Sequence, residues 1–125
     1  MKIDFEKNIE YYKSTQSVPC DCEICQVYYS HIKSRYPEIS DYLDSIHVDI
    51  LRPFELIWLQ FKEKKQIEYY SCQYIVFGDC EDDVKMQFGD ITLEKSFNHP
   101  STKDIDGRHF VIEFGPIVLP DDSKS

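Results

Sequence analysis

The spacing of apolar side chains predicts two helices in the first half of the chain. We expect one helix over residues 22 to 35 with Asp21 as its N-cap, and Pro37 then interrupts the chain and starts a second, shorter helix. The first helix face is formed by Ile24, Val27, Tyr28, His31, Ile32 and Arg35. The second is formed by Ile39, Tyr42, Leu43 and Ile46. Both faces have amphipathic spacing, so both helices should pack on another layer.

After His47 the pattern becomes that of a sheet. Residues 54–61 and 67–77 are rich in aromatic and branched side chains and flank a charged turn at 62–65, which predicts a β-hairpin. The second of these segments is apolar on both faces towards its end, as in a central strand. Further strands are expected at residues 84–88, 91–97 and 109–114.

These elements predict an α+β fold in one domain, residues 1–125. An N-terminal helical pair should pack on a mainly antiparallel sheet of about five strands. Residues 1–15 fit either a helix or an extended arm, and residues 116–125 are expected to form a surface tail. Trp58 is expected in the core of a central strand; at a sheet edge it would instead mark a partner surface.

Charge narrows the choice of partners. The chain has 14 basic and 23 acidic residues and a net charge of -9, which disfavours nucleic acid and anionic membranes. Residues 66–125 carry most of the excess, and a candidate surface for a basic protein partner is the run Asp79, Glu81, Asp82 and Asp83. A calcium loop is disfavoured there because Val84 stands where the sharp turn needs glycine. The alternative interpretation is a solvated acidic loop that serves solubility.

Three of the five cysteines, Cys20, Cys22 and Cys25, fall within six residues. A C-x-C combined with a C-x-x-C allows sulfur atoms to converge on one metal ion, and zinc is the ion that such spacing suggests. A structural zinc site needs a fourth ligand, for which the sequence supplies no paired motif. The remaining candidates are His31, Cys72, Cys80, His99 and His109.

Two other interpretations of the cysteines stay open. Cys22 and Cys25 at a helix start could form a redox pair, because a helix N-terminus stabilises thiolate, although the strand that precedes such a pair in thioredoxin-like folds is missing. Alternatively, the cysteines are reduced apolar residues that anchor the helix. The first ten residues do not resemble a signal peptide, so we expect a cytosolic protein with reduced thiols.

No catalytic signature stands out. His99 lies in a polar loop that we interpret as a turn, and the four glycines form no phosphate-binding motif. The sequence therefore favours a small, acidic, non-enzymatic protein that binds a basic protein partner, as an immunity-type or antitoxin-like inhibitor does. The alternatives are a thiol-dependent redox protein using Cys22 and Cys25, and a structural zinc module.

Overall fold

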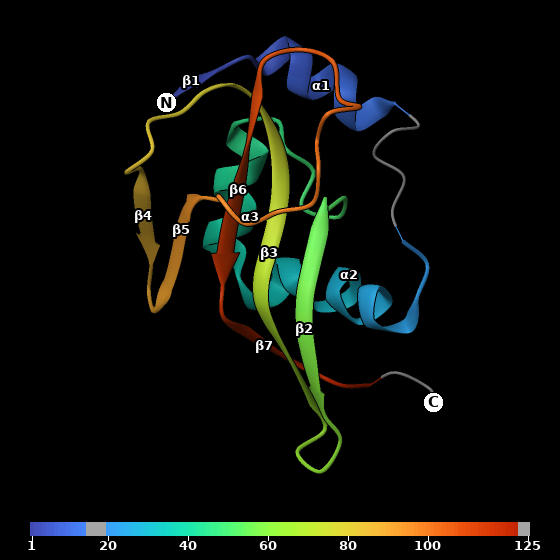
Figure 1. Ribbon diagram of the computed structural model, residues 1–125. Helices are drawn as coiled ribbons and strands as arrows, with labels where there is room; N and C mark the ends of the chain where they lie inside the picture. Colours follow the sequence, from blue (N-terminus) through green and yellow to red (C-terminus); the bar gives the residue numbers. More distant parts are fainter. Residues whose placement is uncertain (15–19, 123–125) are drawn as a thin grey trace.

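The computed structural model describes residues 1–14 and 20–122 and has an α+β fold, as predicted (Figure 1). Three helices and seven strands occur in the described part of the chain. The helices are α1 (Phe5–Lys13), α2 (Glu23–Arg35) and α3 (Pro37–Ser45). The strands are β1 (Lys2–Ile3), β2 (Glu55–Phe61), β3 (Gln66–Asp79), β4 (Lys85–Phe88), β5 (Ile91–Lys95), β6 (His109–Gly115) and β7 (Ile117–Pro120).

Strand β3 lies at the centre of the sheet, as predicted from the apolar residues on both of its faces. It pairs antiparallel with β2 and β1 along one edge and with β7 and β6 along the other. Strands β5 and β4 extend the sheet beyond β6. The predicted hairpin is confirmed as β2 and β3, but the described sheet has seven strands rather than about five.

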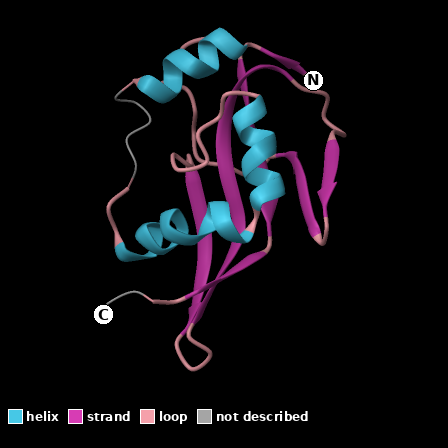
Figure 2. Ribbon diagram, turned by 180° about the vertical axis from the view of Figure 1, so that it is seen from behind, coloured by secondary structure: helices cyan, strands magenta, loops and turns pink. Residues whose placement is uncertain are grey.

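Helices α2 and α3 cover one face of the sheet, whereas α1 lies across one end of it (Figures 1 and 2). The layer between helices and sheet contains Tyr28 of α2 and Tyr74 of β3, both fully buried, with their hydroxyl oxygens 2.5 Å apart. The Tyr74 hydroxyl also donates to the Ile50 carbonyl oxygen at 2.8 Å. The tyrosine-rich core is therefore stable because its hydroxyl groups have partners.

Helix α1 resolves the ambiguity at the N-terminus in favour of a helix over most of the segment; Thr15, the end of the predicted arm, lies outside the described residues. Asn8 holds this helix in place. Its side-chain amide donates to the Ile46 carbonyl oxygen, and its carbonyl oxygen accepts from the Phe77 N–H, each at 2.8 Å. One buried polar side chain thus ties α1 to both the helical layer and β3.

Two sequence predictions about the lower half of the sheet are wrong. Trp58 is 43% exposed because β2 pairs only with β3 among the described strands, so it lies at an edge and not in the core. The expected tail after Pro116 instead begins with β7, whose Ile117 and Leu119 are buried. Their alternation with Pro116 and Val118 is the two-residue period of a strand, which the flanking prolines obscure. Residues 123–125 of the expected tail lie outside the described part.

Candidate metal site and sheet surfaces

The candidate metal site lies where the chain enters α2. The sulfur atoms of Cys20, Cys22 and Cys25 all lie within 4.8 Å of one another. Cys20 and Cys22 are exposed, and Cys25 is half-buried at the first turn of the helix. Within the described residues, no other group of three or more cysteine, histidine or carboxylate side chains is arranged in this way. The structure thus brings together the three residues that the sequence singles out.

Backbone hydrogen bonds to sulfur shape the turn. The N–H of Cys25 donates to the sulfur of Cys22, and the N–H of Cys22 donates to the sulfur of Cys20, both at 3.4 Å. Cys22 is therefore the N-cap of α2, and the prediction that Asp21 caps the helix is wrong. The sulfur replaces the oxygen that usually accepts from the free N–H groups of a first turn.

Two tyrosines hold the turn against the rest of the fold. The Tyr69 hydroxyl on β3 donates to the Ile24 carbonyl oxygen at 2.8 Å. The Tyr29 hydroxyl, one helical turn after Cys25, donates to the Cys20 carbonyl oxygen at 2.9 Å. The backbone of the cysteine turn is thus fixed from the sheet and from its own helix, which favours a preformed ligand set.

The electrostatic surroundings separate two of the thiols. Burial opposes ionisation of Cys22, but hydrogen bonds from the side chain and backbone of Cys25 outweigh it and lower the Cys22 pKa. Burial, followed by the neighbouring Cys22 and Cys20 side chains, raises the Cys25 pKa far above its ordinary value. Cys22 is thus the member of this pair that more readily forms thiolate.

None of the expected fourth ligands joins the cluster. Cys72 is fully buried in the core, and Cys80 donates to the Glu81 carbonyl oxygen. The His31 ring nitrogen Nε2 is 2.8 Å from an Asp122 carboxylate oxygen. The two other candidates, His99 and His109, each have Nδ1 2.8 Å from a nearby backbone carbonyl oxygen.

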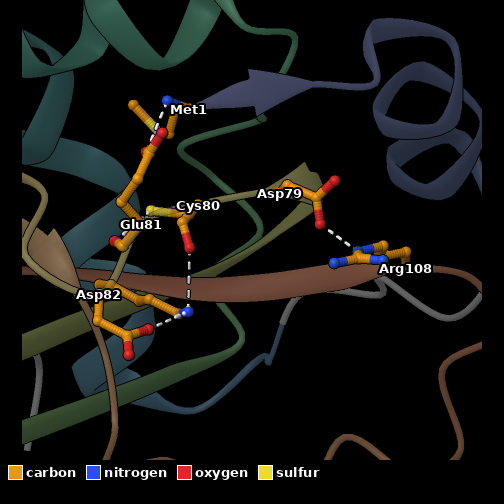
Figure 3. Close-up of polar contacts among 7 residues, drawn as sticks. Met1, Asp79, Cys80, Glu81, Asp82 and Arg108 are labelled. Atoms are coloured by element: carbon orange, nitrogen blue, oxygen red, sulfur yellow. Dashed lines mark hydrogen bonds and ion pairs between the residues drawn. The ribbon is translucent and has the colours of Figure 1, made fainter.

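The predicted acidic surface contains its own cations (Figure 3). Asp79 pairs with Arg108. Glu81 lies 2.8 Å from the Met1 amino group, and Asp82 lies 2.9 Å from the Lys95 ammonium, which also donates to the Cys80 carbonyl oxygen. Asp83 is exposed. Most of the negative charge on this loop is therefore balanced locally, which weakens its attraction for a basic partner.

A row of half-buried carboxylates lies on the sheet face turned away from α2 and α3, which we call the open face. The loop between β5 and β6 crosses part of this face, and its Asn98 carbonyl oxygen accepts from the Gln73 amide at 3.1 Å. The strand register places Glu55, Gln73, Glu113 and Glu94 side by side across β2, β3, β6 and β5. Gln73 follows the helix-facing Cys72 and precedes Tyr74, so this row points to the opposite side. Gln73 itself is fully buried. Glu113 accepts from the Ser71 hydroxyl at 2.7 Å, and Glu94 lies 3.9 Å from the Lys85 ammonium.

Exposed apolar side chains adjoin this row on the open face. Trp58 pairs with Tyr69, which contacts α2, so the neighbours of Trp58 project from the opposite side of the sheet. The exposed apolar residues on that side are Ile57, Leu59, Tyr70 and Val118. The sequence analysis missed this surface, although the alternation of Glu55, Ile57 and Leu59 along one strand is a signal for it once the strand is known to be an edge.

Comparisons of the chain with protein-family models, with curated proteins and with solved structures gave no match. No activity or partner can therefore be inferred for this chain from its similarity to another protein. Among the described residues, no helix combines the length and apolar character needed to cross a membrane.

Proposed function

We propose that this protein binds a thiophilic metal ion, such as zinc, through Cys20, Cys22 and Cys25. The observation that carries the proposal is the mutual approach of three sulfur atoms within 4.8 Å at a turn fixed by hydrogen bonds. Thiolates that converge in this way repel one another without a cation, and a soft divalent or monovalent ion stabilises them. A reducing compartment such as the cytosol would keep the thiols free to bind it.

The proposed metal has a structural role at the start of α2. It would join the chain before the helix, at Cys20, to its first turn, at Cys25, and would strengthen the attachment of α2 to β3 through Tyr69. Because binding favours the folded state, the loaded protein should melt at a higher temperature than the metal-free protein.

Native mass spectrometry of protein purified without chelator tests this proposal. We expect one metal ion per chain, lost when the three cysteines of the cluster are changed together to serine. A Cys80→Ser variant is the matched control, since Cys80 lies outside the cluster, and it should keep the metal. Metal-free wild-type protein, or equal metal content in the triple variant, would contradict the proposal.

The same spectra address a redox role for Cys22 and Cys25. Their opposed pKa shifts within one helical turn favour this second candidate, because a readily ionised thiol beside a protonated one is the arrangement that starts thiol–disulfide exchange. A mass lower by two hydrogen atoms would show a disulfide between the two cysteines and would support this role. The external disulfide that oxidises them is itself reduced to two thiols by the same two electrons and two protons. Only the reduced mass after incubation with oxidised glutathione would exclude a redox role.

We also propose that the open face binds a basic protein partner, which an immunity-type or antitoxin-like inhibitor would require. The supporting observations are the exposed apolar group containing Ile57 and Leu59 and the adjacent glutamate row. Apolar contact would supply affinity, and Glu55, which is half-buried on the edge strand β2, would favour lysine or arginine. This surface replaces the Asp79–Asp83 loop as the candidate because the carboxylates of that loop already have cations nearby.

Calorimetric titration with a short peptide of alternating lysine and leucine tests the open face. We expect saturable one-to-one binding that persists at physiological salt and is lost in an Ile57→Ser, Leu59→Ser double variant. Trp58→Ser is the control, because Trp58 is equally exposed on the opposite side of the same strand. Binding that vanishes at physiological salt, or that falls equally in the control, would contradict the proposal.

A further inference from the structure

Among the described residues, the cysteine cluster contains three candidate ligands and lacks a fourth. No described carboxylate or imidazole lies within the group formed by the three sulfur atoms, although Asp21 and Glu23 are neighbours in sequence. Residues 15–19 and 123–125 contain no cysteine, histidine, aspartate or glutamate. The described side chains therefore offer an incoming ion three sulfur atoms and one open position.

The other potential ligands are committed elsewhere in the fold. Cys72 lies in the core, and its exposure would require α2 to separate from β3. His31 is on α2 but its ring bonds to Asp122, and Cys80 lies in the loop beside the Met1 amino group (Figure 3). Bringing Cys72 to the cluster would require the core to open, and His31 and Cys80 would each have to leave the contacts described for them.

Metal ions differ in how well three sulfur ligands satisfy them. Zinc in structural protein sites takes four ligands, so here it would keep a water molecule in the open position. Monovalent copper is softer, favours thiolate over oxygen, and does not require a fourth ligand. The exposure of Cys20 and Cys22 leaves the open position accessible to solvent and to an external thiol.

We infer that the cluster of Cys20, Cys22 and Cys25 is a three-sulfur site suited to monovalent copper, and that zinc binds there only with an exchangeable fourth ligand from solvent. This inference rests on the proposed metal-binding function and names the class of ion for it. The bound copper would be exchangeable through its exposed side, unlike the ion of a closed structural zinc site.

X-ray absorption of the protein loaded separately with Cu(I), under anaerobic conditions, and with zinc tests the inference. We expect copper to have three sulfur neighbours and no nitrogen or oxygen, and zinc to have three sulfurs and one oxygen. Zinc with four protein ligands, or copper with only two sulfurs, would overturn the inference while leaving metal binding intact. Failure of both ions to bind would overturn the proposed function as well.

Single substitutions provide the second readout. Each of the three changes to serine within the cluster should weaken copper binding by at least about tenfold, since even residues that only support a ligand have effects of that size. Cys72→Ser and Cys80→Ser should leave the affinity unchanged. A cluster variant with wild-type affinity, or a loss of affinity in Cys80→Ser, would contradict a site made of these three sulfurs.

Discussion

The sulfur of Cys22 accepts the N–H of Cys25 at 3.4 Å, so one of the three candidate metal ligands is also the N-cap of α2. The cap and the ligand use the same atom. Metal binding and the start of the helix are therefore linked, because an ion bound to the Cys22 sulfur alters the acceptor of the Cys25 N–H.

Substitution of Cys22 separates these two roles. Serine is a better N-cap than cysteine but a poor ligand for soft ions, so Cys22→Ser should keep the metal-free stability and lose metal affinity. Cys22→Ala removes both functions and should lower the free energy of unfolding of the metal-free protein by about 1 kcal/mol. Urea denaturation of both variants with and without zinc measures the two effects. If the metal-free Cys22→Ala variant were as stable as the metal-free wild type, the Cys22 sulfur would not be an effective N-cap.

The opposed pKa shifts of Cys22 and Cys25 predict an order of alkylation. Only thiolate reacts with iodoacetamide, and the lowered Cys22 pKa gives it more thiolate at neutral pH than Cys25, whose pKa is raised. As the pH is increased in metal-free protein, peptide mass spectrometry should detect modification of Cys22 at a lower pH than modification of Cys25. Modification of Cys25 before Cys22 would be inconsistent with the hydrogen bonds described for this turn.

The two buried tyrosines of the core should differ in their sensitivity to loss of the hydroxyl group. Tyr74→Phe removes the donor to the Ile50 carbonyl oxygen and the bond to the Tyr28 hydroxyl. Tyr28→Phe removes the bond to Tyr74 and the contact with the Cys72 thiol, but leaves Tyr74 bonded to Ile50. We expect a loss of about 2 kcal/mol for Tyr74→Phe and about 1 kcal/mol for Tyr28→Phe in chemical denaturation. The reverse order would mean that Tyr28 has the more important hydrogen bond.

The pairing of β1 with β3 requires glycine at position 78. Its φ of +127° and the Lys2 carbonyl oxygen beside it leave no room for a Cβ atom. Gly78→Ala should therefore displace β1 and destabilise the fold by about 1–3 kcal/mol. Gly89→Ala is the control, since Gly89 also has a positive φ but faces open space, and it should cost about 1 kcal/mol or less. Equal losses would indicate that contact with β1 contributes little.

Periodicity predicts α2, α3, the hairpin and the central position of β3, because their apolar patterns stand out. It leaves α1 open between a helix and an extended arm. The pattern does not reveal that Trp58 lies at an edge, since edge position depends on which strands pair and not on local sequence. It also fails for β7, where Pro116 and Pro120 enclose only a short run with buried Ile117 and Leu119.

The cysteine cluster could be found from sequence because its three members are close along the chain. The sequence could not show that the charges of Asp79, Glu81 and Asp82 are balanced. Their partner cations are distant along the chain and are brought near only by the fold: Arg108, the Met1 amino group and Lys95. For the same reason the Glu55, Glu113 and Glu94 row appears only once the strand register is known.

Cobalt(II) absorption spectroscopy tests the central claim most directly, because cobalt occupies zinc sites and its bonds to thiolate produce intense charge-transfer bands. The metal-binding role of Cys20, Cys22 and Cys25 predicts that these bands saturate at one cobalt per chain in wild-type and Cys80→Ser protein. It also predicts that they disappear when the three cluster residues are changed to serine. No charge-transfer bands in the wild type, or undiminished bands in the triple variant, would contradict it.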